Sequence, residues 1–193
     1  MRVIAGTHRG RRLSGPRGIA LRPTSDKVRE ALFSILGTQV SGSRFLDLYA
    51  GTGAVGIEAL SRGAASVTFV ESDPKAVQLL QKNLQTCQLV NRAQVCVGQT
   101  ATFLKRKDWW RGPYDVLFAD PPYASLDELE TLIHAWRPGL LSEHATLIIE
   151  QDSRTTLPAS IDHCTLVRRY VYGDTALYLY GLSASESTEL TAS

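Results

Sequence analysis

The sequence lacks the signs of a disulfide-bonded, zinc-stabilised or membrane-spanning protein. Its 193 residues include three cysteines, none of them in a C-x-x-C pair, so we predict neither a disulfide framework nor a zinc site, and no other metal. No apolar run approaches the length of about eighteen residues that spans a bilayer. The opening MRVIAGTHRGRR has no apolar core of a secretory signal peptide, and we therefore expect a cytoplasmic protein.

Strong compositional bias is also absent. Hydrophobic residues make up 44% of the chain and charged residues 21%, which are the proportions of an ordinary globular domain and exclude fibrous or wholly disordered classes. A chain of this length is long enough to bury a core of its own. We therefore expect one globular domain.

Acidic residues are missing from the first 25 positions, where arginines gather. The net charge of the whole chain is only +2, but six arginines precede the first acid, Asp26. They are Arg2, Arg9, Arg11, Arg12, Arg17 and Arg22. A basic segment without carboxylates favours contact with a polyanion, most commonly a phosphate backbone, whereas a solvated, flexible end would have the same composition.

The first 37 residues predict an arm followed by a helix. Short β-like pieces around Gly6 and Gly10 indicate a small hairpin or extended arm. Residues 22–36 then have apolar side chains at helical spacing, with start signals up to Asp26 and a glycine, Gly37, directly after the last of them.

The remainder alternates between strand and helix patterns. Strands are predicted at residues 45–49, 66–72, 93–98, 114–120 and 145–151, with helices at 55–62, from 74, after 98 and at 126–138. Segments 164–172 and 176–182 are joined by a link so short that they must be antiparallel. We predict an α/β, Rossmann-like, doubly wound sheet of seven strands, mostly parallel, with an antiparallel C-terminal hairpin. The expected divisions are a basic arm at 1–22, the main domain at 23–182 and a disordered tail at 183–193.

A glycine loop joins the first predicted strand to its helix. Gly51, Gly53 and Gly56 form the pattern G-x-G-x-x-G, and Glu71 ends the next strand twenty residues after the first of them. This outline fits a nicotinamide dinucleotide or S-adenosylmethionine, because the backbone can approach either and the acid can bind a ribose diol. Asp47 favours S-adenosylmethionine, since a carboxylate would repel a pyrophosphate and attract the ammonium and sulfonium. The plainer interpretation is a tight turn that Asp47 merely caps.

The stretch FADPPYAS ends an apolar strand on the same edge of the predicted sheet. Pro121 and Pro122 remove two backbone donors and stiffen the turn, so the acceptors there are held outward. Asp120 and the Pro121 carbonyl could bind an amino group and orient its lone pair toward a methyl donor, while Tyr123 offers a ring for stacking. Asp120 could then accept the released proton. An ordinary strand-ending turn is the plainer alternative.

Three further residues are weaker candidates. His8 lies among the arginines and more readily contacts phosphate than acts as a base, although a solvent-exposed role is equally compatible with its position. Gln99 and Thr100 follow the third strand and could border an adenine pocket, but a plain helix start explains Thr100 as well.

The blocks RVIAGTHRGRRL, RPTSDKVREALFSIL, LDLYAGTGAVGIEALSRGA, FVESD and DVLFADPPY occur in this order. With them the chain resembles, over residues 2–182, the bacterial ribosomal-RNA guanine-N2 methyltransferases of the RsmD type, which modify one guanine of 16S rRNA. The resemblance implies a class I methyltransferase fold, S-adenosyl-L-methionine as cofactor and 16S rRNA, in an assembled or assembling small ribosomal subunit, as partner. We also expect a monomer without membrane contact.

The motifs and the resemblance together imply a set of site residues. Cofactor contacts are expected from Asp47, Tyr49, Gly51, Gly53, Gly56, Glu71, Ser72, Gln99 and Thr100, catalytic roles from Asp120, Pro121 and Tyr123, and RNA contacts from His8, Arg9, Arg11, Arg12, Arg22, Thr24, Asp26 and Pro122. Gln99 departs from the family pattern, in which an Asp is common near the adenine.

Two other functions are compatible with these motifs. One is methylation of a DNA amine or a protein glutamine, because related motifs with Asn or Asp before two prolines serve those substrates. The other is an RNA-binding assembly factor that has the methyltransferase fold but does not catalyse methyl transfer. The first two sequence blocks argue against the former, and the intact glycine loop and D-P-P-Y argue against the latter.

Overall fold

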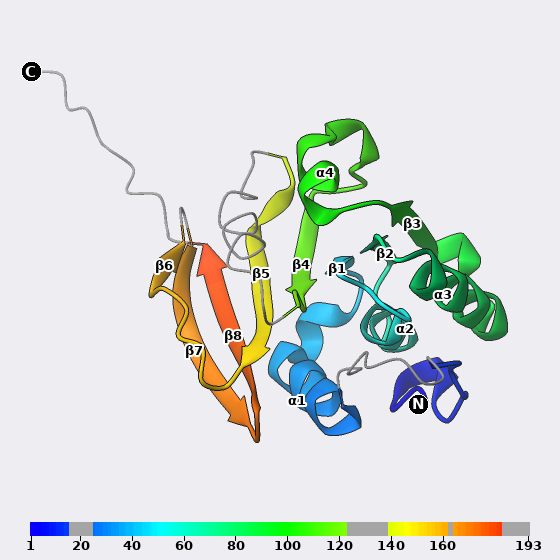
Figure 1. Cartoon of the computed structure of the whole chain (residues 1–193), viewed down its shortest axis with the longest axis horizontal. Helices are drawn as coiled ribbons and strands as arrows, with labels where there is room; N and C mark the ends of the chain where they lie inside the picture. The colour runs from blue at the N-terminus through cyan, green and yellow to red at the C-terminus, as the bar shows by residue number, and fades with distance from the viewer. Residues whose placement is uncertain (16–24, 123–138, 162–163, 183–193) are drawn as a thin grey trace, which may run out of the picture.

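The computed structural model describes residues 1–15, 25–122, 139–161 and 164–182. These form one eight-stranded sheet with the strand order β3-β2-β1-β4-β5-β8-β7-β6, and helices lie against it (Figure 1). The helix predicted at 126–138, the candidate residues Arg22, Thr24 and Tyr123, and the tail lie outside the described residues.

The parallel part of the sheet is the βαβ half predicted from the sequence. Its strands are β1 (Arg44–Leu48), β2 (Ser66–Glu71), β3 (Ala93–Val97), β4 (Tyr114–Ala119) and β5 (Leu141–Asp152). Each of the pairs β1–β2, β1–β4, β2–β3 and β4–β5 is parallel. The carboxyl ends of β1, β2 and β4 therefore meet at one edge of the sheet, with β1 in the middle.

The antiparallel part completes the sheet beyond β5. Strand β8 (Thr175–Leu182) pairs with both β5 and β7 (Cys164–Tyr172), as the predicted hairpin requires. The seven predicted strands, mostly parallel with an antiparallel C-terminal pair, are confirmed. Strand β6 (Ser160–Ile161) adds a short edge to β7, and it was not predicted because two residues show no alternation.

Helices cover both faces of the sheet. The described α-helices are α1 (Asp26–Leu36), α2 (Ala54–Ser61), α3 (Pro74–Cys87) and α4 (Thr100–Lys105), and the 3-10 helices are η1 (Gly6–His8), η2 (Gly37–Val40), η3 (Val90–Arg92) and η4 (Lys107–Trp109). Apolar residues of α1, α2 and α3 pack in one hydrophobic cluster, whereas Phe103 and Leu104 of α4 belong to a second. Among the described helices, none is long and apolar enough to cross a membrane.

Helix α1 begins and ends where its sequence predicts. The Ser25 side chain accepts a hydrogen bond from the Val28 N–H at 3.2 Å and caps the first turn. At the other end Gly37 has φ of 53°, a left-handed conformation that glycine adopts without strain.

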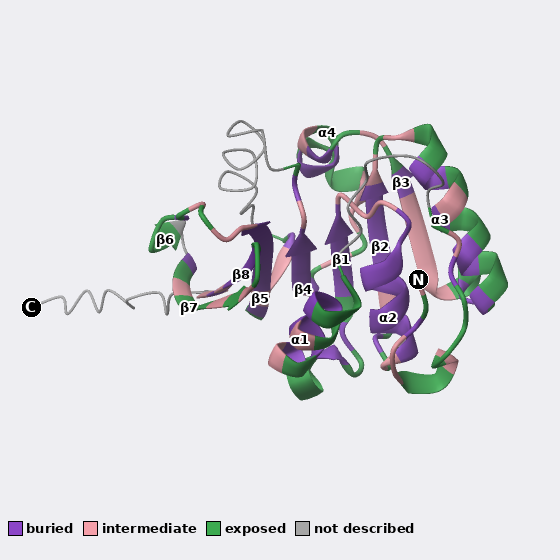
Figure 2. Ribbon diagram, turned by 60° about the horizontal axis from the view of Figure 1, so that its bottom comes forward, coloured by how far each residue is buried: buried purple, intermediate pink, exposed green. Residues whose placement is uncertain are grey.

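The basic arm folds back on itself as a small hairpin and covers α2. An antiparallel bridge joins Arg2 to Arg12, and the Val3 N–H donates to the Arg11 carbonyl at 3.0 Å. Val3 and Leu13 are buried in the same hydrophobic cluster as α2. All eight residues of α2 are buried, and Figure 2 shows this helix in the colour of buried residues.

The contact between the arm and α2 is so close that it excludes a side chain at Gly6. A Cβ there would lie 1.9 Å from the Ser61 carbonyl oxygen. Gly10 has nearly the same left-handed backbone, with φ of 82° against 79°, but nothing lies within 4 Å of its Cβ position. Substitutions at Gly6 and Gly10 therefore separate the cost of a steric clash from the cost of a left-handed backbone conformation.

We predict that Gly6→Ala lowers the free energy of unfolding more than Gly10→Ala. Both variants force alanine into a left-handed conformation, which costs roughly 1–2 kcal/mol. Gly6→Ala must in addition push the arm away from α2, which costs about 1–3 kcal/mol more. Urea unfolding of the two variants measures the difference, and equal losses would show that the arm does not pack tightly on α2.

Candidate active site

The glycine loop, Glu71 and Asp120 lie at one edge of the sheet. Leu48 at the end of β1 pairs with Ala119 at the end of β4, so the two segments that follow, Tyr49 to Gly53 and Asp120 to Pro122, start side by side. Burial is the main cause of the raised pKa of Asp47, and the charges of Asp120 and Glu71 add to it because both lie near this carboxyl. The predicted cofactor and catalytic motifs are thus brought together at the site that open α/β sheets use for ligands.

The loop turns sharply between β1 and α2. Tyr49 and Gly51 have φ of 60° and 55°, and Gly53 has φ of 77°. Tyr49 is therefore a non-glycine residue in the left-handed region, which is uncommon and marks a constrained position. The Gly53 N–H donates to the Ala50 carbonyl at 2.8 Å and closes the turn before the first residue of α2.

The three glycines of the motif have different roles. No atom lies within 4 Å of a Cβ position at Gly51, so the backbone there faces open space. At Gly53 a Cβ would lie 2.2 Å from Leu80 Cδ1, and at Gly56 it would lie 2.2 Å from the Phe69 ring. Gly53 and Gly56 thus allow the loop and α2 to pack against α3 and β2, whereas Gly51 leaves room for a ligand.

Asp47 caps the loop from within the protein. It is 1% exposed, and its Oδ2 accepts a hydrogen bond from the Gly56 N–H at 2.9 Å. Burial raises the pKa of its carboxyl to about 8, with smaller contributions from the charges of Asp120 and Glu71, while the Gly56 hydrogen bond lowers it. The loop-capping contact considered from the sequence is therefore present. Attraction of a ligand cation by Asp47 stays a prediction.

Glu71 holds the outside of the same loop. Its Oε2 accepts the Gly51 N–H at 2.7 Å, and its Oε1 accepts the N–H groups of Ser72 and Asp73 at 2.7 and 2.8 Å. A carboxylate can accept about four hydrogen bonds, so these contacts leave capacity for a ribose hydroxyl. The sequence predicted the ribose role but not the bridge from Glu71 to the glycine loop.

Gln99 and Thr100 lie close to the end of β2. The Gly98 N–H donates to the Glu71 carbonyl at 2.9 Å, which places the start of α4 next to the glutamate. Gln99 precedes the first residue of α4, its side chain makes no capping hydrogen bond, and it is exposed. Thr100 is buried as the first residue of α4, so only Gln99 has a side chain open to a ligand.

The proline corner follows β4 directly. Pro121 is buried, Pro122 is exposed and Asp120 is half-buried. A proline cannot continue the hydrogen-bond ladder of a strand, which explains why the apolar run of β4 stops at this edge. Tyr123 follows the corner but lies outside the described residues.

The described residues of the arm divide into exposed and anchored groups. Arg9 and Arg12 are exposed. Arg11 is also exposed, but its Nη1 donates to the Thr86 carbonyl on α3 at 2.8 Å.

The His8 backbone N–H donates to Ser61 Oγ at 2.9 Å. Partial burial together with the Arg11 charge lowers the pKa of the His8 ring. His8 is therefore mainly neutral at neutral pH.

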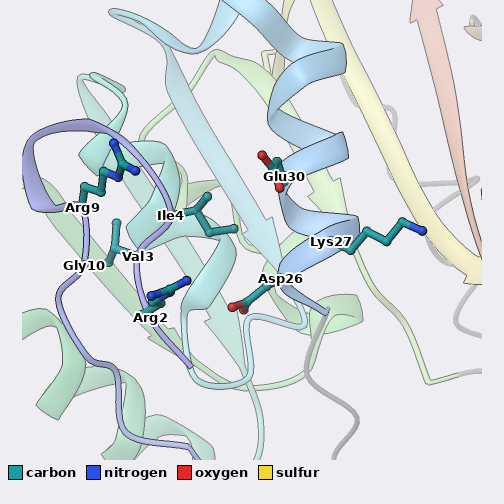
Figure 3. A pocket seen from close by; sticks show the side chains of 8 residues that line it. All are labelled: Arg2, Val3, Ile4, Arg9, Gly10, Asp26, Lys27 and Glu30. Atoms are coloured by element: carbon teal, nitrogen blue, oxygen red, sulfur yellow. The ribbon is translucent and has the colours of Figure 1, made fainter.

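A cavity of about 390 Å³ lies between part of the arm and the first turns of α1 (Figure 3). Its walls are Arg2, Val3, Ile4, Arg9 and Gly10 of the arm and Asp26, Lys27 and Glu30 of α1. The cavity brings together two predicted RNA contacts, Arg9 and Asp26, from separate segments. Lys27 and Glu30 were not singled out from the sequence, because charges at the start of an amphipathic helix usually mark only its solvated face.

Glu58 was missed altogether by sequence reasoning. It is fully buried on α2, and its two carboxylate oxygens accept the N–H groups of Ile4 and Ala5 at 2.7 and 2.9 Å. The Arg62 Nε donates to the same carboxylate at 2.7 Å. An acid within the apolar segment AVGIEALS was the available signal, since a buried charge must find partners.

Asp47 gives a pH-dependent prediction. Its folded-state pKa is raised from 3.8 to about 8, so its contribution to stability is complete below about pH 3.8 and is lost as the pH rises through about 8. Asp47→Asn keeps an oxygen for the Gly56 N–H but cannot ionise. Between these pH values the variant should gain stability relative to the parent by at most about 1.4 kcal/mol per pH unit. Urea unfolding from pH 5 to 9 tests this, and a difference that does not vary with pH would contradict the burial argument.

Comparisons with known proteins identify the family. The chain matches the family described as Conserved hypothetical protein 95 over residues 1–181. It is 39% identical over 186 residues to YlbH of Bacillus subtilis strain 168, covering 93% of this chain and 98% of that protein. It is 36% identical over 189 residues to the Ribosomal RNA small subunit methyltransferase D of Escherichia coli K12, covering 98% of this chain and 93% of that protein.

Solved structures agree with this assignment. The yhhF protein of Escherichia coli superimposes with a TM-score of 0.82 at 37% identity, covering 95% of this chain and 98% of that one. SMU.776, solved in complex with SAH, shares the fold with a TM-score of 0.63 at 18% identity, covering 81% of this chain and 48% of that one. The resemblance drawn from the sequence blocks is confirmed, and the chain belongs to the family of small-subunit ribosomal RNA methyltransferase D.

Proposed function

We propose that this protein transfers a methyl group from S-adenosylmethionine to the exocyclic N2 amine of a guanine in 16S rRNA of the small ribosomal subunit. The observation that carries the proposal is the convergence of the glycine loop, Glu71 and the proline corner at the carboxyl ends of β1, β2 and β4. Membership of the family that includes the Escherichia coli small-subunit enzyme supports ribosomal RNA as the substrate.

The residues at this edge fit S-adenosylmethionine. The open space at Gly51 lets a ligand approach the backbone, and Glu71 retains capacity to accept from a ribose hydroxyl. Tyr49 precedes Gly51 by two residues and Ser72 follows Glu71. Gln99 precedes α4 next to the end of β2, and we expect an adenine on that side. When bound, the cofactor supplies an electrophilic methyl group on a sulfonium. The SAH complex of SMU.776, which has the same fold, supports this choice.

A nicotinamide dinucleotide fits the edge less well. The charges of Asp120 and Glu71 lie near Asp47, whose own carboxyl is kept largely protonated below about pH 8 by burial, and a pyrophosphate would add further negative charge beside them. A sulfonium and an ammonium would instead be attracted to Asp120 and Glu71. The charge distribution therefore favours the methyl donor over the dinucleotide.

Asp120 and the Pro121 carbonyl are suited to bind the target amine. Both would accept hydrogen bonds from its N–H groups, which favours a pyramidal nitrogen whose lone pair faces the methyl carbon. As the nitrogen–carbon bond forms and the carbon–sulfur bond breaks, the amine must lose a proton, and Asp120 would receive it and pass it to solvent. Tyr123 and Pro122 would support the base, although Tyr123 lies outside the described residues.

The basic arm is proposed to hold RNA. Arg9 and Arg12 are exposed on it, and Arg9 and Asp26 line the cavity next to α1. His8 and Arg11 would contribute from the anchored side of the arm, together with Arg22, the last residue of the arm, and Thr24, which follows it closely in the sequence. Cys87 and Cys96 are buried thiols outside any disulfide, which supports a reducing compartment, the cytoplasm, where ribosomes are assembled. The protein is proposed to act there as a monomer.

The reaction is tested by incubating the protein with radiolabelled S-adenosylmethionine and one of four acceptors: small subunits lacking the modification, naked 16S rRNA, duplex DNA or a protein release factor. We expect label in the rRNA of the subunits, recovered as N2-methylguanosine after digestion. Label found only in DNA or protein would overturn the substrate assignment. Cofactor binding without transfer to any acceptor, together with faster subunit assembly, would favour the RNA-binding factor.

We expect Asp120→Ala to reduce methyl transfer by roughly 100- to 1,000-fold, because it removes an acceptor that acts in the transition state. Cofactor affinity should stay within about threefold, since the glycine loop and Glu71 are unchanged. Single-turnover transfer and calorimetric binding of S-adenosylhomocysteine measure the two effects. Loss of cofactor binding with the transfer step intact would place Asp120 in the cofactor site instead.

A further inference from the structure

Asn83 connects the basic arm to the glycine loop. Its side chain on α3 is 1% exposed and makes three hydrogen bonds. The Oδ1 accepts the Ser14 N–H at 2.7 Å, and the Nδ2 donates to the Ser14 and Thr52 carbonyls, both at 3.0 Å. One buried amide therefore joins the end of the described arm to the residue between Gly51 and Gly53.

The arm and the loop share one face of α3. Leu80, one turn before Asn83, is the residue that a Cβ at Gly53 would strike. Thr86, one turn after it, accepts the hydrogen bond from Arg11. Residues three or four apart lie on the same side of a helix, so this face positions both the glycine loop and the arm.

The hydrogen bond to Thr52 fixes a peptide plane of the loop. The Thr52 carbonyl and the Gly53 N–H belong to the same rigid peptide unit. Asn83 holds the carbonyl, and the Ala50 carbonyl accepts the N–H at 2.8 Å. Without Asn83 the buried Thr52 carbonyl would lose the hydrogen bond that it accepts from the Asn83 Nδ2. The Thr52–Gly53 peptide could then rotate away from its present conformation.

We infer that Asn83 is a positioning residue through which the arm stabilises the cofactor-binding conformation of the glycine loop. The inference rests on the proposed placement of the cofactor against that loop. It follows that the arm does more than hold RNA, because an arm correctly seated on α3 also improves cofactor affinity. The coupling is reciprocal, so bound cofactor should stabilise the arm.

Variants at Ser14 separate this role from a general loss of packing. Ser14→Pro removes the backbone N–H that Asn83 accepts and leaves the glycine loop untouched. Ser14→Ala keeps both backbone groups and is the matched control. Asn83→Leu keeps a side chain that branches at Cγ, although a larger one, and removes all three hydrogen bonds. Calorimetry with S-adenosylhomocysteine, on protein shown to be folded by circular dichroism, measures the dissociation constant of each.

We expect Asn83→Leu to raise the dissociation constant about five- to tenfold and Ser14→Pro about threefold or more, as for loss of one hydrogen bond. Ser14→Ala should match the parent. The KM for the cofactor should rise with the dissociation constant, while kcat at saturating cofactor changes less. An unchanged affinity in folded Ser14→Pro would overturn the inference. Failure of the parent protein to bind S-adenosylhomocysteine would instead contradict the proposed cofactor site.

Hydrogen exchange on the unaltered protein provides a test that does not depend on variants. If the arm and the loop are coupled, S-adenosylhomocysteine should slow exchange of the Ser14 amide at least severalfold, although this residue belongs to the arm. The Arg169 amide on β7, far across the sheet, is the internal control. Binding of the ligand with no change at Ser14 would also overturn the inference.

Discussion

The Glu71 carboxylate joins the two loops on which the site depends. It accepts hydrogen bonds from Gly51 in the loop after β1 and from Ser72 and Asp73 in the turn after β2. Asp47 holds the same glycine loop from the buried side through Gly56. Because both side chains accept hydrogen bonds from backbone N–H groups, they hold the loop in one conformation, and the loop is thereby preorganised for the cofactor that we propose to bind there.

The sheet topology explains how distant motifs become one site. Strand β1 lies between β2 and β4, so residues near positions 50, 71 and 120 meet at one edge although they are far apart along the chain. The basic arm completes the arrangement, because it covers α2 through Glu58 and reaches α3 through Asn83. The arm that is proposed to hold RNA is thereby part of the same structural unit as the cofactor loop.

Local sequence patterns predicted most of the helices, strands and turns, but they could not predict polar contacts between residues far apart in the sequence. The βαβ alternation, the limits of α1 and the glycine loop follow from periodicity, capping and turn chemistry, all of which act over a few residues. Glu58 and Asn83 accept hydrogen bonds from the backbone N–H groups of Ile4 and Ser14, more than fifty residues away. No spacing of residues in the sequence predicts such contacts. The cavity beside Asp26 was missed for the same reason, because its walls come from two separate segments.

The proposed reaction requires the proline corner to present its oxygen atoms to a base amine beside the methyl donor. A crystal structure of the protein with S-adenosylhomocysteine would show whether it does. We predict that Glu71 accepts hydrogen bonds from the ribose and that Asp120 and the Pro121 carbonyl face the sulfur across a space that a guanine can enter. A cofactor bound elsewhere, or a corner turned away from the sulfur, would contradict the account.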